Sequence, residues 1–149
     1  MKEAWCTMVG IVGSLVTTVF GGWSTAMTAL VIFMAIDYIS GVIVAGVFNK
    51  STKTNSGSLS SIVGIKGLFR KGGMLAIVLI AHYLDLVMGS NFIKDAVVIA
   101  FIANETISII ENMGLMGVPI PKVIIKAIDV LKEQTDGFDE EERGENNGN

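Results

Sequence analysis

The feature of this sequence that most limits its fold is an uncharged run. Residues 4–36, a stretch of 33 residues, contain no Asp, Glu, Lys or Arg. A surface helix of a soluble protein needs a polar face, which this run does not provide. The run also exceeds the roughly 20 residues that one helical membrane crossing requires. Residues 135–149, by contrast, hold seven charged residues. This uneven distribution of charge predicts a membrane protein with a polar tail.

Composition excludes several other classes of protein. The chain has 149 residues, a formal net charge of −3 and one cysteine, Cys6. These values exclude a multi-domain protein, a disordered chain and a secreted module built on disulfides. The acidic balance argues against nucleic acid as a partner. Because the chain has a single histidine and no metal-binding or phosphate-loop motif, we predict no enzymatic activity, no metal and no cofactor.

Four apolar segments are long enough to be transmembrane helices: residues 4–20, 24–48, 72–90 and 91–113. None shows the period-two alternation of a membrane β-barrel, so helices are expected. The first segment is expected to be retained, because its apolar stretch is too long for a signal peptide. The prediction is an all-α integral membrane bundle over residues 1–113. It has four crossings, or three if residues 4–20 lie on the membrane surface.

The connection over residues 49–71 is basic and contains no acid. Its charged residues, expected to set topology and to contact anionic headgroups, are Lys50, Lys53, Lys66, Arg70 and Lys71. The positive-inside rule places this loop in the cytoplasm, and four crossings then place both termini there too. Beyond the bundle, residues 114–134 are predicted to form a breaker-rich link and an amphipathic helix. The acidic residues 135–149 are predicted to be disordered.

Ionisable side chains at membrane depth are the strongest functional signal. Asp37, Asp85 and Glu105 interrupt apolar segments, and ionised they would together cost roughly 8–10 kcal/mol on insertion scales. No Lys or Arg lies in the central part of a predicted segment. His82 shares a helical face with Asp85 and is expected to pair with it. Asp37 and Glu105 are therefore expected to be protonated, hydrogen-bonded between helices or in contact with water.

Further polar residues extend these positions into stripes along the predicted helices. The set expected to line a pore or to join helices is Asp37, Ser40, His82, Asp85, Asn104, Glu105, Ser108, Glu111 and Asn112. One interpretation is that the stripes hold helices together. The other is that they face a water-filled lumen. A bundle of this size is too thin to enclose such a lumen alone, so the second interpretation requires several copies of the chain.

Several short motifs occur in a specific order between residues 35 and 132. They are Asp37-Tyr-Ile-Ser-Gly41, Ser58-x-x-Ser61-x-x-Gly64-x-Lys66-Gly67 with Arg70-Lys71, Asp85, Asn104-Glu105-x-x-Ser108-Ile109-x-Glu111-Asn112, and Gly117-x-Pro119-x-Pro121. In these motifs and their spacing the chain resembles the phage holin family, which includes holin-like toxin-secretion proteins. The N-terminal segment and the acidic tail lie outside the resemblance.

The resemblance implies a small protein of the bacterial inner membrane that assembles with itself into a large pore or lesion. Such a pore lets a cytoplasmic endolysin, or in relatives a toxin, cross the membrane and times host lysis. Two alternatives follow from the residues alone. One is a proton-linked transporter or ion-channel subunit that uses His82, Asp85 and Glu105 as a relay. The other is a non-conducting membrane scaffold.

Overall fold

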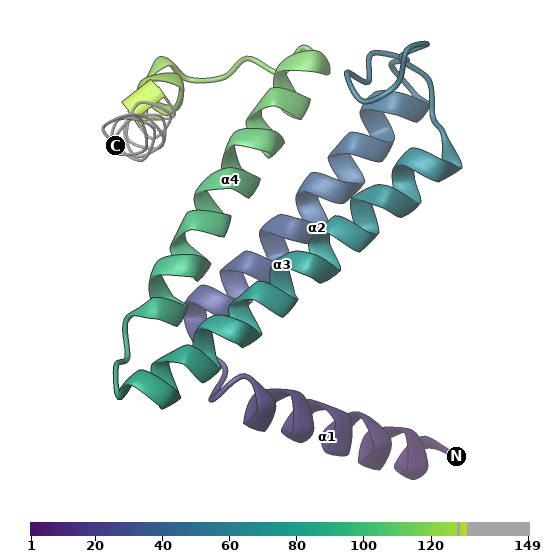
Figure 1. Ribbon diagram of the computed structural model, residues 1–149. Helices are drawn as coiled ribbons and strands as arrows, with labels where there is room; N and C mark the ends of the chain where they lie inside the picture. Colours follow the sequence, from purple (N-terminus) through teal and green to yellow (C-terminus); the bar gives the residue numbers. More distant parts are fainter. Residues whose placement is uncertain (128, 131–149) are drawn as a thin grey trace, which may run out of the picture.

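The computed structural model describes residues 1–127, 129 and 130, and this part of the chain is helical with connecting loops (Figure 1). Its helices are α1 (Lys2–Val19), α2 (Thr25–Gly46), α3 (Ser61–Met88) and α4 (Ile93–Leu115). Residues 122–127 are also helical. The prediction of an all-α chain is thus confirmed for the described residues. The predicted tail, residues 135–149, and the end of the predicted amphipathic helix lie outside them.

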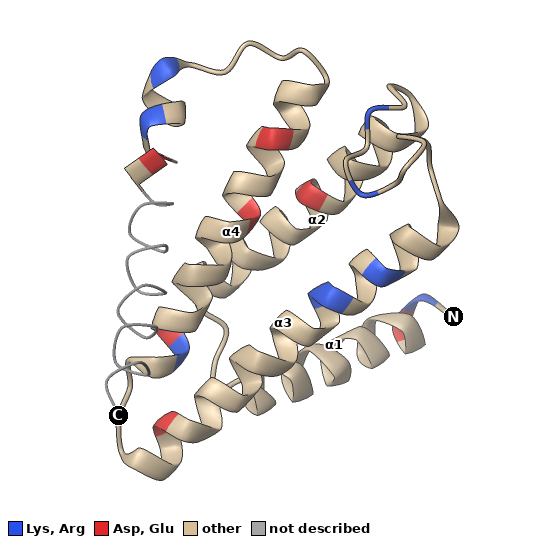
Figure 2. Cartoon of the chain, turned by 45° about the horizontal axis from the view of Figure 1, so that its top comes forward, with Lys and Arg blue, Asp and Glu red and all other residues tan. Residues whose placement is uncertain are grey.

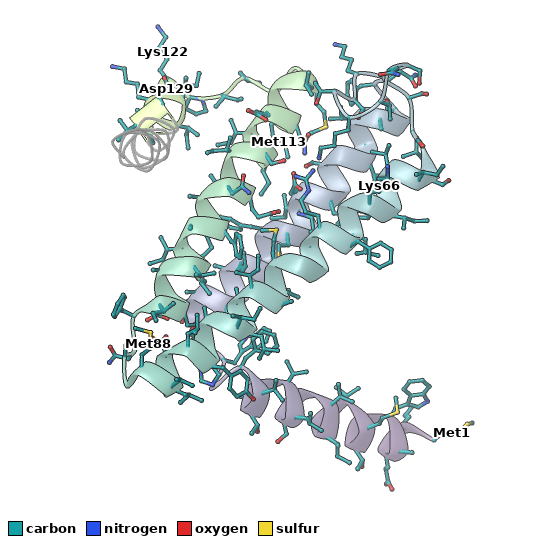
Figure 3. All side chains as sticks on the ribbon, viewed as in Figure 1. Met1, Lys66, Met88, Met113, Lys122 and Asp129 are labelled. Carbon is teal, nitrogen blue, oxygen red and sulfur yellow. The ribbon has the colours of Figure 1, made fainter. Side chains whose placement is uncertain are left out.

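Helices α2, α3 and α4 form a bundle in which α2 and α4 run in the same direction and α3 runs opposite to both (Figure 1). Helix α4 packs chiefly along α2 and then along α3, whereas α2 and α3 contact each other least. The long α2–α3 loop, residues 47–60, lies at the same end of the bundle as the end of α4. We call this the loop end. The short α1–α2 and α3–α4 connections lie at the opposite end, which we call the turn end; Met88 marks it in Figure 3, whereas Lys66 and Met113 lie toward the loop end.

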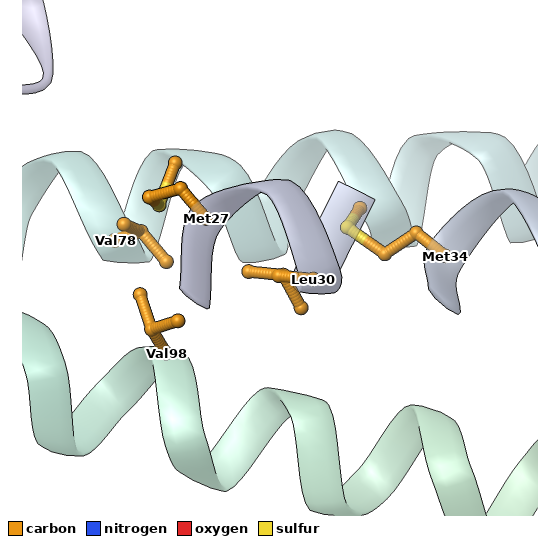
Figure 4. Packing of buried hydrophobic residues seen from close by; sticks show 5 residues of the cluster. All are labelled: Met27, Leu30, Met34, Val78 and Val98. Carbon is orange, nitrogen blue, oxygen red and sulfur yellow. The ribbon is translucent and has the colours of Figure 1, made fainter. Parts of the chain in front are cut away.

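An apolar core fills the half of the bundle near the turn end. It consists of the buried side chains Met27, Leu30, Met34, Val78 and Val98 (Figure 4). These residues come from all three helices of the bundle and leave little or no surface exposed. Between helices in lipid, such close van der Waals packing is a main source of stability. This core positions the polar groups that follow it along the helices.

Helix α1 stands apart from the bundle. It has no buried residue and projects away from the turn end (Figure 1). It is separated from α2 by Gly21 and Gly22, which have φ values of +66° and +100°. Side chains other than hydrogen are strained at such φ values, so the Gly-Gly pair makes the change of direction possible. The prediction of a helix over residues 4–20 is confirmed, but its place relative to a membrane stays a prediction.

Two of the described helices, α2 and α3, are long and apolar enough to cross a membrane by length and composition. Crossings by α1 and α4 stay predictions. The exposed surface of the bundle is largely apolar, as Ile39 on α2, Ile80 on α3 and Ile99 on α4 illustrate. A surface of this kind suits contact with lipid chains more than contact with water.

The predicted start of the third helix is wrong. The sequence predicts a basic loop over residues 49–71, yet α3 begins at Ser61. Apolar residues at helical spacing, such as Ile62, Ile65 and Phe69, alternate with the basic residues of this stretch. They continue the apolar face of α3 by about three turns. Positive charge alone therefore does not define a loop, and three of the five basic residues, Lys66, Arg70 and Lys71, are helical.

Candidate functional site

The centre of the candidate site is Lys71, which lies on α3 and faces α2 and α4. Its side chain is buried, and its Nζ donates a hydrogen bond to Oδ2 of Asp37 at 2.8 Å. The same Nζ also donates to Oε2 of Glu105 on α4. One cation thus pairs with carboxylates of two helices at once. The expectation that Asp37 and Glu105 have no cationic partner is wrong, because Lys71 belongs to α3 and not to the predicted loop.

Asp37 connects most of the polar groups around it. Its Oδ1 accepts hydrogen bonds from Ser108 Oγ and from Asn112 Nδ2, the latter at 3.1 Å. Asn112 Nδ2 also donates to Ser40 Oγ at 2.9 Å. We call the residues joined in this way the polar cluster: Asp37, Ser40, Lys71, Glu105, Ser108 and Asn112.

The polar cluster ties α2, α3 and α4 together within one chain. In the described part of the chain, no buried side-chain nitrogen or oxygen lacks a hydrogen-bond partner. Removal of one partner of a buried ion pair typically lowers the stability of a protein by about 3–5 kcal/mol. Of the three states expected for Asp37 and Glu105, the structure therefore shows hydrogen bonding between helices. Whether these groups also line a pore stays a prediction.

Asp85 and His82 lie apart from this cluster, at the turn end. Asp85 does not form the expected pair with His82. Its carboxylate accepts hydrogen bonds from Ser90 Oγ at 2.6 Å and from the backbone N–H groups of Ile93 and Lys94 at 3.1 and 2.8 Å. A carboxylate in this position satisfies free N–H groups at the start of α4 and interacts favourably with its dipole. Asp85 therefore has a structural role in the α3–α4 turn.

His82 packs against the turn between α1 and α2. A Cβ atom built on Gly21 would lie 1.9 Å from Cε1 of His82, so the imidazole ring occupies the space beside this glycine. The Lys94 Nζ donates to the Phe20 carbonyl oxygen at 3.2 Å and adds a second contact in the same region. These contacts attach the end of α1 to the bundle. They leave the proposed relay of His82, Asp85 and Glu105 divided, because Glu105 belongs to the polar cluster.

A cavity of about 530 Å³ lies between the helices at the loop end. Asp37, Lys71 and Glu105 line it where it approaches the middle of the bundle. Asn104 and Glu111, both on the exposed side of α4, line it as well. Toward the loop, its lining includes three further cations, Lys53, Lys66 and Arg70. Figure 2 shows basic residues in the loop and in the first part of α3, near acidic residues of α2 and α4.

The role of Lys71 could have been found from helical spacing. The buried residues of α3 are Lys71, Met74, Val78, Ala81 and Asp85. They recur every three or four residues and so share one helical face. Extending this face backward from Asp85 leads directly to Lys71. The prediction that Lys71 contacts lipid headgroups is wrong, because its side chain is buried. The other four basic residues of that prediction, Lys50, Lys53, Lys66 and Arg70, are exposed.

The observations describe a small α-helical protein with two candidate membrane-crossing helices and a buried inter-helix ion cluster. The chain belongs to the bacteriophage holin family, whose family model matches residues 14–133. The resemblance seen in the sequence motifs is thus confirmed, and the match extends beyond it toward the N-terminus. The family is not a family of enzymes.

Curated relatives agree with this membership. An uncharacterised protein of Listeria monocytogenes is 38% identical over 130 residues, which cover 87% of this chain and 86% of the relative. An uncharacterised protein of Clostridium perfringens is 34% identical, with 87% and 93% covered. A protein of Bacillus phage phi105 that is named a probable holin is 33% identical, with 72% and 74% covered. No solved structure matches the chain.

Proposed function

We propose that this protein is a holin that assembles with copies of itself in the bacterial inner membrane. The assembly forms a pore or lesion through which an endolysin, or a toxin, leaves the cytoplasm, and it times lysis of the host. The observation that carries this proposal is membership of the bacteriophage holin family over residues 14–133, supported by the phage relative named a probable holin.

The geometry supports a mechanism in which the polar cluster, buried between helices in the single chain, becomes exposed to water in the assembly. In the single chain the cluster faces inward and the surface is apolar, which suits a protein dispersed in lipid. A water-filled lesion needs the opposite arrangement, with polar groups facing the lumen. Because α2 and α3 contact each other least, the ion pair of Lys71 with Asp37 is a main polar link between them. Separation of these helices as copies gather exposes the cluster to water.

A liposome assay distinguishes this function from the two alternatives. The full-length protein is reconstituted at increasing protein-to-lipid ratios into vesicles that contain folded proteins of graded size together with a pH-sensitive dye. A holin releases folded proteins above a threshold ratio. A proton-linked transporter or channel changes only the internal pH or releases small solutes, and a scaffold releases nothing. Retention of all folded cargo at every ratio contradicts the proposal.

Lysis in cells tests the biological role. The chain is expressed in bacteria together with a cell-wall hydrolase that lacks an export signal, and the turbidity of the culture is followed. We expect an abrupt fall in turbidity only when both proteins are present. Cells that contain the chain with an inactive hydrolase control for damage caused by the membrane protein alone. Equal lysis in that control would show that release of the hydrolase is not involved.

The proposed orientation can be tested through Cys6, the one cysteine of the chain. Cys6 is exposed near the start of α1. With four crossings it lies at the cytoplasmic side, and a membrane-impermeant thiol reagent labels it in inverted vesicles only. With three crossings and α1 on the membrane surface, it lies on the outer side and is labelled in intact spheroplasts. A cysteine introduced at exposed Ser56 in the loop, with Cys6 replaced by Ser, reports the cytoplasmic side independently.

A further inference from the structure

The cavity at the loop end is lined by several cations that do not belong to the polar cluster. Lys71 is paired with Asp37 and Glu105. Lys53, Lys66 and Arg70, by contrast, take no part in these two ion pairs. All three line the cavity. Glu111 also lines it and has an interaction of its own. The loop-end part of the cavity therefore holds an excess of positive charge.

The three cations come from two segments that the fold brings together. Lys66 and Arg70 are four residues apart on α3 and so lie on the same side of the helix. Lys53 comes from the α2–α3 loop, which also contributes Thr54 and Ser60 to the lining. The arrangement offers ammonium, guanidinium and hydroxyl donors around one space. Donors of these kinds are suited to phosphate oxygens, and an arginine can bind two of them at once.

Apolar side chains complete the lining. Val42 on α2, Leu59 in the loop and Val63 on α3 face the same cavity. The volume, about 530 Å³, lies within the usual range of sites for small molecules. A ligand with a phosphate at one end and an apolar part at the other matches this lining better than a free carboxylate does. The position at the end of two candidate membrane helices favours the same kind of ligand.

We propose that this cavity binds an anionic phosphate group, held by Lys53, Lys66 and Arg70. The phosphate belongs to a phospholipid headgroup or to a soluble phosphate, and the same three side chains recognise either. Lys50, which lies in the same loop, is not part of the lining and has no role in the site. The proposal therefore separates two basic residues that are only three positions apart in the sequence.

Lipid binding to the full-length protein in a non-ionic detergent tests the proposal. Native mass spectrometry follows titrations with short-chain phosphatidylglycerol, short-chain phosphatidylcholine and inorganic phosphate. We expect saturable binding of one phosphatidylglycerol per chain and weaker binding of phosphatidylcholine, whose choline group carries a positive charge. Inorganic phosphate that competes equally well assigns the site to a soluble phosphate, and failure to compete assigns it to the lipid. The proposal is overturned if neither phosphatidylglycerol nor inorganic phosphate binds in a saturable way.

A pair of variants with the same change in net charge controls for general electrostatic attraction. The first combines Lys66→Gln with Arg70→Gln, and the second combines Lys50→Gln with Lys126→Gln, both at exposed positions outside the lining. Loss of two charge-assisted contacts should weaken binding by about tenfold or more in the first variant. The second should stay within about twofold of the wild type. Equal weakening in both variants overturns the proposal, because it shows attraction to the basic surface as a whole.

Circular dichroism of each variant confirms that helical content is kept, which is expected because Lys66 and Arg70 are exposed. The experiment measures binding and not permeabilisation. A protein that binds phosphatidylglycerol but releases no cargo would therefore contradict the proposed pore and leave this site intact. The reverse result, release of cargo without saturable phosphate binding, would overturn the site alone.

Discussion

The two halves of the bundle are built from the same three helices but are stabilised differently. Near the turn end, Met27, Leu30, Met34, Val78 and Val98 form a closely packed apolar core (Figure 4). Near the loop end, the same helices enclose the polar cluster and a cavity. Apolar packing leaves no room or partners for water, whereas ionised groups beside a cavity can be hydrated. The bundle therefore combines a sealed half with a half that can admit water.

This difference defines where a barrier to water lies. The cavity extends from the loop to Asp37, Lys71 and Glu105, and the apolar core begins at Met34, about one helical turn further along α2. In a single chain, the core closes the route across the bundle. A water-filled path consequently requires separation of the helices in the sealed half, and the polar half supplies the groups that can then be hydrated.

Replacement of Lys71 by Met tests the polar half and has the largest expected effect. It leaves the carboxylates of Asp37 and Glu105 without their cation, and the loss of one partner of a buried pair costs about 4 kcal/mol. Unfolding of the reconstituted protein by sodium dodecyl sulfate, followed by circular dichroism, measures the change. Lys66→Met, on an exposed face of the same helix, should change stability by about 0.5 kcal/mol or less.

A triple variant tests whether Lys71→Met lowers stability through unpaired charge or through a change in side-chain shape. Addition of Asp37→Asn and Glu105→Gln to Lys71→Met removes the unpaired charges and should restore part of the lost stability. If Lys71→Met and Lys66→Met were equally stable, the polar cluster would contribute nothing to the bundle and the contrast between its halves would be lost.

Replacement of Leu30 by Ala tests the sealed half in the same way. Leu30 is fully buried, so the variant leaves a cavity and should lose about 3 kcal/mol of stability. The same denaturant titration measures it, with exposed Ile32→Ala on α2 as the matched control. We also expect this variant, in the proposed pore, to release cargo at a lower protein-to-lipid ratio than the wild type. Unchanged stability would show that the core is not closely packed.

Much of this arrangement could be predicted from the sequence. The second predicted segment ends within two residues of α2, and the fourth matches α4 to the same extent, because long apolar runs set these helices. The start of α3 differs from the prediction, because the positive charges of residues 61–71 indicate a loop although the apolar residues between them have helical spacing. An ion pair such as Lys71 with Asp37 joins residues 34 positions apart. Its formation depends on how helices are rotated against each other, which local patterns do not determine.

Replacement of Gly21 by Ala tests how α1 is joined to the sealed half. Gly21 has a φ of +66°, and a Cβ there would collide with the His82 ring. Backbone strain costs about 1–2 kcal/mol at such a position, and displacement of the ring adds to it. Gly22→Ala is the control, because its φ is also positive but a Cβ meets no atom within 4 Å. If the midpoint of thermal unfolding falls by the same amount in both variants, the contact with His82 contributes nothing to stability.

Replacement of Asp85 by Asn has the smallest expected effect and tests whether the turn end also depends on charge. The carboxylate accepts from three donors at the α3–α4 turn, and an amide retains one acceptor oxygen while losing the charge that interacts with the α4 dipole. We expect a loss of about 1 kcal/mol and faster hydrogen exchange at the Ile93 and Lys94 amides.

Asp95→Asn, in the first turn of α4, changes the same dipole interaction without these hydrogen bonds. If both variants exchange alike at Ile93 and Lys94, Asp85 acts only through its charge. Selectively faster exchange in Asp85→Asn would show that hydrogen bonds hold the turn closed beneath the apolar core, so that polar contacts border the sealed half at both of its ends.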